Sequence, residues 1–387
     1  MKAELEKYFD RLWPICRSIT GNGLRESFRI LNELIPMQLT EVATGTRVLD
    51  WNVPKEWNIT DAWIETPDGK KIAQFSENNL HVVNYSVAVD SKVDYETLKQ
   101  HVHTHPPLPD AIPYVTSYYK ERWGFCMSQN EWDQLPTEGL YRVYIDSSLK
   151  DGSLTYGQCV LPGASNEEIL FSTYLCHPSM ANNELSGPLA LAMLYRHIAA
   201  MPHRRYTYRF VVAPETIGII ALLAAEGEHL KKHVKAGYVL TCCGDPGAFT
   251  YKMSKHKTSL ADRAAAHVLK YHHPDARIIP FAVGGSDERQ YCSPGYNLPV
   301  GSLMRTPYQQ YPEYHTSLDN KHFISFGALE ETVNTYTDIV RLIEHNQYLR
   351  CTVQYGEPNM GSRGLYPTSA EPSSARDALH RMMHLLS

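Results

Sequence analysis

Residues 168–200 read EILFSTYLCHPSMANNELSGPLALAMLYRHIAA and place a strand, a polar turn and a helix in direct succession. The first eight residues are mostly apolar, which is typical of a strand buried on both faces. The last fourteen carry apolar residues at helical spacing. Because a buried strand that feeds a helix is the repeating unit of α/β proteins, this stretch predicts an α/β fold.

The same strand-and-helix unit recurs along the chain. Further strands are predicted at 141–146, 154–162, 208–214 and 236–243, and further helices at 220–234, 259–273 and 328–346. Apolar strands separated by helices imply a layered α/β domain with a largely buried sheet. In such sheets functional residues gather in the loops that leave the carboxyl ends of the strands.

Three regions of the chain differ in composition and in hydrophobic pattern. Residues 41–135 contain short β-branched and aromatic runs between turn signals, so we expect an inserted β-rich domain. The α/β domain then comprises residues 1–40 and 136–350, and residues 351–387 form a C-terminal tail with one helical stretch. Within the insert, residues 104–125 are rich in proline and aromatics. That composition suits an ordered loop that covers another part of the molecule.

Composition excludes several classes of function. The chain has 387 residues, with 37 basic and 42 acidic side chains and a net charge of −5. Nucleic-acid binding needs a clustered basic surface, so we expect no nucleic-acid partner. We expect no membrane partner either, because no apolar stretch approaches the roughly 18 residues that span a bilayer. The N-terminus does not resemble a secretory signal, and eight scattered cysteines fit reduced thiols, so we expect a cytoplasmic protein. Homo-oligomerisation is left open.

Two predicted strand ends carry residues suited to chemistry. His177 leaves the strand at 168–175, where it could present a neutral imidazole to a metal, although a lone histidine there is more often structural. A polar cluster, Asn182-Asn183-Glu184, follows on the turn into a helix and favours the functional interpretation. Glu215 follows the strand at 208–214, and burial there would raise the pKa of its carboxylate into the range of a general base. The alternative for Glu215 is an acid that merely favours a helix N-terminus.

Two further loops are candidates. Asp245 lies in an Asp-Pro-Gly turn after another apolar run, which by itself favours a plain structural turn. His315 has carboxylates nearby in sequence, as metal-bound histidines usually do. A serine or cysteine nucleophile is disfavoured because the chain has no G-x-S-x-G motif. Cys176 precedes His177, but neighbouring strand residues point to opposite faces.

Seven longer motifs extend over nearly the whole chain. They are VPKEWNITDAWI (53–64), NNLHVVNYS (78–86), IPYVTSYYKERWGFC (112–126), CHPSMANNELSGP (176–188), PETIGII (214–220), SDERQYCSPG (286–295) and YPEYHTSLDN (311–320). With the order of acids and histidines above, they resemble aminopeptidase-like proteins that carry an inserted domain of unknown function and are often associated with polysaccharide or natural-product biosynthesis. That group is similar to the co-catalytic zinc aminopeptidases and the glutaminyl cyclases.

The resemblance implies a three-layer fold with a mixed, mainly parallel central sheet and a zinc site. His177 and Asp245 match ligands of one zinc ion, His315 matches a ligand of the second, and Glu215 matches the general base. Asn183 stands where the family has an aspartate that bridges two metals, and Thr216 stands where it has a second glutamate. Two anionic ligands are therefore missing.

We accordingly expect one zinc ion per chain, with Asn183, Glu184 or His315 completing the ligands of His177 and Asp245. Members of the group commonly end in a winged-helix module, so we expect residues 351–387 to be its remnant.

The resemblance further implies hydrolysis of an amide bond in a short peptide or an aminoacylated biosynthetic intermediate. Glu215 would move the proton, and His315 would bind the metal or the developing oxyanion. The predicted substrate-binding residues are Asp287, Glu288, Glu313, Tyr314 and Tyr118, and an acid among these, or Glu184, would hold a free α-amine. The alternative, favoured by Asn183 and Thr216, is a catalytically silent protein that binds an amino compound or a partner enzyme.

Overall fold

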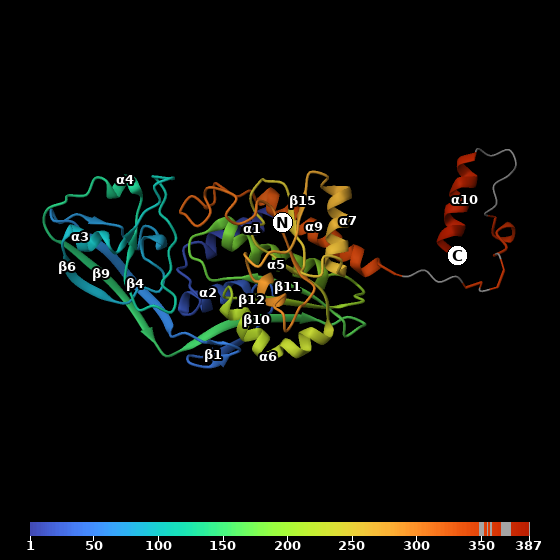
Figure 1. The fold of residues 1–387 in the computed structure, drawn as a ribbon, viewed down its shortest axis with the longest axis horizontal. Coiled ribbons are helices and arrows are strands. Elements are labelled where there is room, and N and C mark those ends of the chain that lie inside the picture. Colours follow the sequence, from blue (N-terminus) through green and yellow to red (C-terminus); the bar gives the residue numbers. More distant parts are fainter. Residues whose placement is uncertain (348–351, 354, 357, 365–372, 387) are drawn as a thin grey trace. The chain divides into compact units, whose positions relative to one another are not determined.

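The computed structural model describes residues 1–347, 352–353, 355–356, 358–364 and 373–386. They form two compact units, Met1–Glu344 and His345–Ser387. The larger unit is built on an eight-stranded sheet in the order β1-β10-β12-β11-β13-β16-β14-β15 (Figure 1). Its strands are β1 (Gln38–Ala43), β10 (Ser153–Leu161), β11 (Glu168–Tyr174), β12 (Thr207–Ala213), β13 (Val234–Val239), β14 (Thr250–Lys252), β15 (Arg277–Ile279) and β16 (Val300–Met304).

The centre of this sheet is parallel. The pairs β12/β11, β11/β13 and β13/β16 run parallel, whereas β1/β10, β10/β12 and β14/β16 run antiparallel. All seven residues of β11 are buried, as expected for a strand covered on both faces. The mixed, mainly parallel sheet of the predicted α/β fold is confirmed.

Helices cover both faces of the sheet (Figure 1). Phe171 and Phe210 pack on one side with the helices α1 (Lys2–Leu12), α2 (Asn22–Leu31), α5 (Ser186–Ala199), α7 (Leu260–His272) and α9 (Phe326–His345). Leu170 and Val211 point to the other side, where α6 (Ile217–His233) and the short α8 (Glu288–Tyr291) lie. The alternation of side chains along each strand thus produces three layers.

A second, four-stranded sheet lies in the inserted region, in the order β5-β4-β9-β6. Its strands are β4 (Glu56–Glu65), β5 (Lys71–Ile72), β6 (Val89–Val93) and β9 (Tyr141–Lys150). The same region also contains the short strands β2 (Arg47–Val48), β3 (Trp51–Asn52), β7 (Val102–His103) and β8 (Phe125–Cys126). Its helical segments are the 3-10 turn η1 (Asn79–His81), α3 (Tyr95–Lys99) and α4 (Gln129–Trp132).

The limits of this sheet differ from the predicted insert, 41–135. Residue 41 lies inside β1 of the large sheet, and β9 lies beyond residue 135. The reason is that β9 leads through residues 151–152 directly into β10, so that a two-residue connection joins the two sheets.

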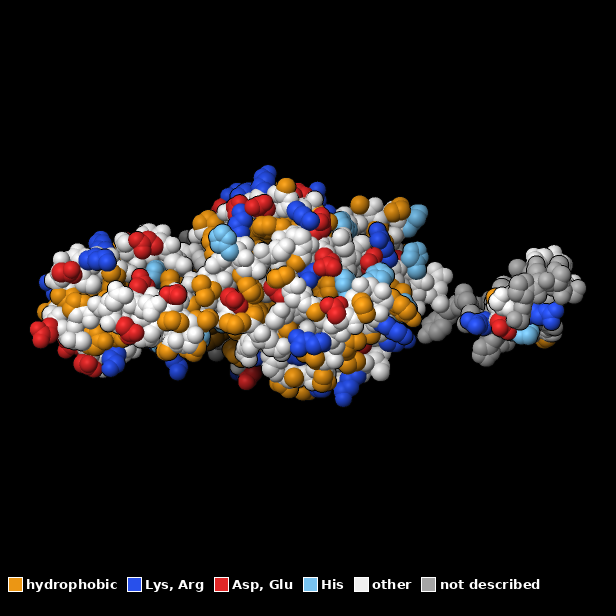
Figure 2. Space-filling model, turned by 90° about the horizontal axis from the view of Figure 1, so that it is seen from above, with side chains coloured by type: hydrophobic (Ala, Val, Ile, Leu, Met, Phe, Trp, Pro, Cys, Tyr) orange, Lys and Arg blue, Asp and Glu red, His pale blue; other side chains and the backbone are white. Residues whose placement is uncertain are grey.

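The smaller unit contains η3 (Gly361–Arg363) and α10 (Ser373–Leu386) among its described residues. Residues 365–372, which fall in the tail predicted as a winged-helix remnant, lie outside the described residues, and that assignment stays a prediction. None of the helices in the described part of the chain is long and apolar enough to cross a membrane. Figure 2 shows acidic and basic side chains interspersed on the face in view, consistent with the small net charge.

The amino end of β11 is fixed by a buried ion pair. Glu168, only 4% exposed, accepts hydrogen bonds from Arg209 Nε at 2.7 Å and Nη2 at 3.1 Å, and from His229 Nε2 at 2.7 Å. Burial raises the pKa of Glu168, but the hydrogen bonds from Arg209 and His229 outweigh it and hold the pKa below its usual range.

We therefore expect Glu168→Gln to lower the free energy of unfolding at pH 7 by about 3 kcal/mol, since it leaves a buried charge poorly compensated. Because the folded pKa is depressed, this stabilisation is complete above the unfolded value of about 4.3 and is lost as the pH falls through the folded value, so parent and variant converge in acid. Urea unfolding at several pH values measures both effects. The control is Glu167→Gln, whose carboxylate is 46% exposed and 3.5 Å from Lys235; an equal loss in the control would contradict the assignment.

Candidate functional site

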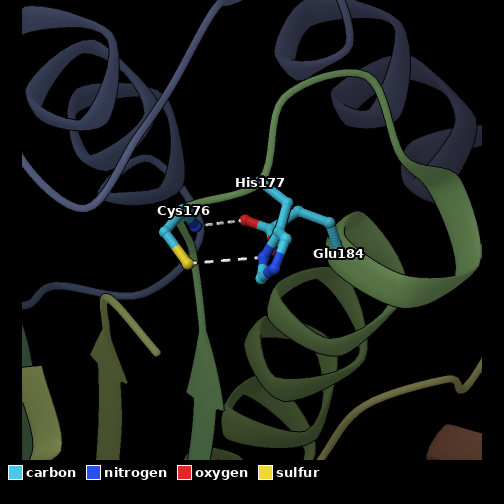
Figure 3. Close-up of side chains that lie close together, drawn as sticks. All are labelled: Cys176, His177 and Glu184. Atoms are coloured by element: carbon cyan, nitrogen blue, oxygen red, sulfur yellow. Dashed lines mark hydrogen bonds and ion pairs between the residues drawn. The ribbon is translucent and has the colours of Figure 1, made fainter. Parts of the chain in front are cut away.

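His177 lies three residues beyond the end of β11, beside a buried carboxylate. Its Nδ1 is 2.9 Å from Glu184 Oε2 (Figure 3). The other carboxylate oxygen of Glu184 accepts the backbone N–H of Cys176 and is 3.8 Å from Arg17 Nε. Burial lowers the pKa of His177, but its contacts with Cys176 and Glu184 outweigh this and hold the pKa well above its usual range. Because Nδ1–H donates to a carboxylate, loss of the other proton leaves the lone pair on Nε2, the usual arrangement of a metal-binding histidine.

A π-helical turn carries Glu184 to this position. The turn, η2 (Ala181–Leu185), precedes α5, and such turns occur often at functional sites. The Ser186-Gly187 pair that follows allows close packing against the sheet. A Cβ at Gly187 would lie 2.3 Å from Thr173 Oγ1 and 2.6 Å from Leu240 O. Glycine is therefore required there for the turn to reach the strand ends.

Glu215 faces His177 across the site. Glu215 Oε2 is 3.7 Å from His177 Nε2. The next residue, Thr216, has φ 65° and ψ −74°, and Ile217 N donates to Glu215 O at 2.8 Å. These values define a γ-turn of the rare, strained positive-φ kind. Asp287 Oδ1 accepts Thr216 N at 2.7 Å and holds the turn in place. Burial raises the pKa of Glu215, and this outweighs the opposing effect of His177.

Asn183 lies on the same η2 turn, next to Tyr174. Asn183 Nδ2 donates to Tyr174 Oη at 2.9 Å, and that hydroxyl donates to Asn183 O at 2.7 Å. The ring centroid of Tyr174 is 5.3 Å from that of His177. Asn183 Oδ1 is buried and has no hydrogen-bond partner among the described residues. An unused buried carbonyl oxygen at this position is a candidate metal ligand.

His315 also reaches the site. Its ring centroid is 5.3 Å from that of His177, and its ring stacks on Tyr314 with centroids 3.9 Å apart. Burial lowers the pKa of His315 well below its usual range, and the charge of His177 adds to this effect. A neutral imidazole is the form that binds a metal.

The inserted region contributes directly to this site. Tyr114 N donates to His315 O at 2.8 Å, and the backbone N–H of Ser317 donates to Ile112 O at 2.9 Å. The ring centroid of Tyr114 lies 5.1 Å from that of His177, and its hydroxyl is 2.9 Å from that of Tyr118. The loop at 104–125 was expected to cover another part of the molecule, and its residues 112–118 lie against the His315 loop.

Asp245 does not join this group. Its Oδ1 accepts Gly247 N at 2.8 Å and Thr306 Oγ1 at 2.6 Å, and its Oδ2 accepts Asn182 Nδ2 at 3.0 Å and Thr306 N at 3.1 Å. Both carboxylate oxygens of this predicted zinc ligand thus accept hydrogen bonds, one from its own turn and three from Asn182 and Thr306. The Asp-Pro-Gly turn directs the carboxylate back toward the backbone, so Asp245 ties three loops together.

The acids predicted to bind an amine are mostly engaged elsewhere. Glu288 Oε1 forms a buried ion pair with Lys252 Nζ at 2.7 Å. Asp287 supports Thr216 as described above. Glu313 differs, because the two hydrogen bonds that it accepts from Thr316 go to its backbone oxygen and do not involve its carboxylate. The sequence argument overlooked Arg289 in the same SDER motif, although the motif was recognised.

His177 and Glu215 line a cavity of about 270 Å³, whereas Asn183 and His315 are not among its lining residues. His177, Glu215 and Arg289 supply its ionisable side chains together with Cys176, and Tyr118 is among its apolar walls. Of the predicted substrate-binding residues, Tyr118 therefore lines the cavity, whereas Tyr314 stacks on His315 outside its lining.

The argument that placed Cys176 and His177 on opposite faces of a strand was wrong. Since β11 ends at Tyr174, strand alternation does not extend to them, and Cys176 Sγ lies 3.3 Å from His177 Nδ1 (Figure 3). Burial raises the pKa of the Cys176 thiol to about 11. A thiol that is protonated at neutral pH is a poor nucleophile, so cysteine catalysis remains disfavoured.

A candidate metal-binding group is present in the described part of the chain. Ligand atoms of Cys176, His177 and Glu184 lie within 4.8 Å of one another. However, both oxygens of Glu184 already accept hydrogen bonds, and the thiol is protonated. We therefore assign Glu184, predicted as a ligand, to the support of His177. The donors left for a metal are the two imidazoles of His177 and His315, a ligand type that zinc takes, and the unpaired amide oxygen of Asn183.

Comparison with known proteins bears on this site. The family described as Domain of unknown function (DUF4910) matches residues 6–346. A Clostridium acetobutylicum protein, named as a candidate polysaccharide biosynthesis protein with an aminopeptidase-like domain, is 45% identical over 364 residues, or 94% of this chain and 83% of that protein. The crystal structure of a candidate peptidase from Clostridium acetobutylicum has a TM-score of 0.90 and 42% identity, covering 100% of this chain and 96% of that one.

A zinc aminopeptidase from Bacillus subtilis has a TM-score of 0.61 and 11% identity, covering 89% of this chain and 94% of that one. Identity this low shows a shared fold alone. Together these similarities confirm the resemblance stated from the motifs and the aminopeptidase-like fold.

The contact of Glu184 with Arg17 generates a prediction. Both side chains are fully buried. Glu184→Gln leaves the Arg17 charge without a carboxylate, so we expect the free energy of unfolding to fall by about 3–5 kcal/mol. Adding Arg17→Met should recover part of this loss, because the uncompensated charge is removed. Denaturant unfolding of both variants is the measurement, with Glu121→Gln, 67% exposed beside Lys55, as the control. A Glu184→Gln variant as stable as the parent would show that the ion pair of Glu184 with Arg17 does not stabilise the fold.

Proposed function

The chain belongs to the DUF4910 family of unknown function, and from that premise we propose that it is a zinc-dependent amide hydrolase of aminopeptidase type. One observation carries the proposal. A histidine whose Nδ1 is fixed by Glu184 presents Nε2 to the carboxylate of Glu215, 3.7 Å away, inside a cavity. His177 is thus an oriented metal ligand, and Glu215 is a base with a raised pKa. A site that activates water requires both.

The donors in the site fit one zinc ion per chain. His177 Nε2, His315 and Asn183 Oδ1 would hold it, since zinc in catalytic sites takes three protein ligands and leaves one position open. Two anionic ligands of the co-catalytic pattern are replaced by Asn183 and Thr216, which disfavours a second ion. Zinc bound there would lower the pKa of a water and polarise the substrate carbonyl.

The residues of the chain have separable roles in this proposal. Glu215 accepts a proton from water on its carboxylate and delivers it to the leaving amine, and the burial that raises its pKa suits both steps. Glu184 keeps His177 in one tautomer. Tyr118 and Ile217 exclude bulk water from the cavity. The substrate would be a short peptide or an aminoacylated biosynthetic intermediate, in keeping with the name of the relative from Clostridium acetobutylicum.

A second candidate, a catalytically silent binding protein, is favoured by the two replacements. Asn183 supplies no charge, and Thr216 Oγ1 accepts a hydrogen bond from Arg289 Nη2 at 2.9 Å and so is not directed to a metal. A silent protein of this kind needs no zinc. Metal content therefore separates the two candidates.

We expect the purified protein to hold about one zinc ion per chain, as a site with a single set of ligands requires. His177→Ala should lose it, whereas His256→Ala, an exposed histidine that contacts Asn297 O, should keep it. Elemental analysis after dialysis is the measurement. A parent protein that takes up no zinc even from added zinc would favour the binding-protein candidate.

Glu215→Gln tests the proposed base. Since general bases contribute about 100- to 10,000-fold, we expect hydrolysis of amino-acid and peptide amides to fall by that factor while zinc content is unchanged. The matched control is Glu228→Gln, an exposed acid on the helix that follows the same strand. Undiminished hydrolysis in Glu215→Gln would exclude this residue as the base.

A further inference from the structure

Arg289 is a cation in the cavity wall whose hydrogen-bonding capacity is only partly used. It lies on α8 and lines the same cavity as His177 and Glu215. Its Nη2 donates to Thr216 Oγ1 at 2.9 Å. Its Nε is buried without a hydrogen-bond partner, and among the described residues the guanidinium forms no ion pair within 4.0 Å. The charge of Arg289 acts on Glu215 and Asp287 from a distance, but it has no direct ion pair, so the guanidinium can still bind an anion from outside the chain.

The aminopeptidase resemblance predicts a negative charge beside the base, whereas Arg289 places a positive charge there. That resemblance expects a second acid at residue 216, next to the base. Here Thr216 instead offers a hydroxyl that steadies Arg289. The nearby acids do not replace the missing one, because neither Asp287 nor Glu288 lines the cavity; Glu288 is paired with Lys252, and Asp287 Oδ1 accepts Thr216 N. A substrate with a free amine therefore meets a cation at this wall.

We propose that the cavity binds its substrate through a carboxylate held by Arg289. The substrate class is then an amide with a carboxylate close to the scissile bond, as in an N-acylated amino acid. Apolar walls from Trp51, Tyr118 and Ile217 would receive the remainder of the molecule. This inference deepens the proposed function and rests on it for the identity of the bond that is cleaved.

Three matched ligands test the inference by isothermal titration calorimetry of the full chain: N-acetyl-L-phenylalanine, its neutral amide, and L-phenylalaninamide with a free amine. A charge-assisted pair contributes a factor of about 10 to 100 in affinity, so the parent should bind the carboxylate that much more tightly than the neutral amide. In Arg289→Gln that ratio should fall to about one, with affinity for the neutral amide within about twofold of the parent.

A second variant, Thr216→Val, keeps the cation but removes the hydroxyl that steadies it, so a smaller loss of the carboxylate preference is expected. A preference that survives Arg289→Gln would come from another cation and would overturn the assignment. So would parent protein that binds L-phenylalaninamide most tightly, or that binds no carboxylate ligand at millimolar concentration.

The experiments can refute the proposed function and the inference about Arg289 independently of each other. A carboxylate preference that depends on Arg289 in a protein that hydrolyses no amide supports the inference and contradicts the proposed hydrolase. Hydrolysis that requires Glu215 but is unchanged in Arg289→Gln supports the proposed hydrolase and contradicts the inference.

Discussion

Glu184 carries its carboxylate where no water reaches it, and three neighbours share that group: the backbone N–H of Cys176, the Nδ1 of His177 and the guanidinium of Arg17. A buried carboxylate is stable only when it is paired and hydrogen-bonded in this way. The orientation of His177 therefore depends on a residue of the N-terminal segment as well as on the α5 turn. Glu215, Asn183 and His315 are useful to a metal or a substrate only because this interaction fixes the Nε2 of His177.

The topology of the sheet explains why residues far apart in sequence meet here. β11 and β12 are neighbouring parallel strands, so the loops that carry His177 and Glu215 leave the same edge of the sheet. The inserted region then closes onto this edge through Tyr114, whose backbone N–H is bonded to the His315 carbonyl. Residues of the inserted region and of the α/β domain both line the cavity, the former through Trp51 and Tyr118.

Strand and helix periodicity predicted the layered fold, because burial on both faces of a parallel sheet leaves a clear pattern in EILFSTYL. The positions of His177 and Glu215 at strand ends followed from the same pattern. The direction of side chains did not follow from it: Asp245 lies in the expected turn, but its carboxylate is held mainly by Asn182 and Thr306, which are distant in sequence. Arg289 was missed because nothing in its sequence shows that Thr216, 73 residues away along the chain, would accept its hydrogen bond.

The central claim is that the Nε2 of His177, and not the neighbouring thiol, is the metal-binding atom. X-ray absorption at the zinc edge of the zinc-loaded protein tests it most directly. The account predicts a first shell of nitrogen and oxygen at about 2.0–2.2 Å with no sulfur. A zinc–sulfur distance of about 2.3 Å would place the ion on Cys176 and contradict the assignment of His177 and Glu184.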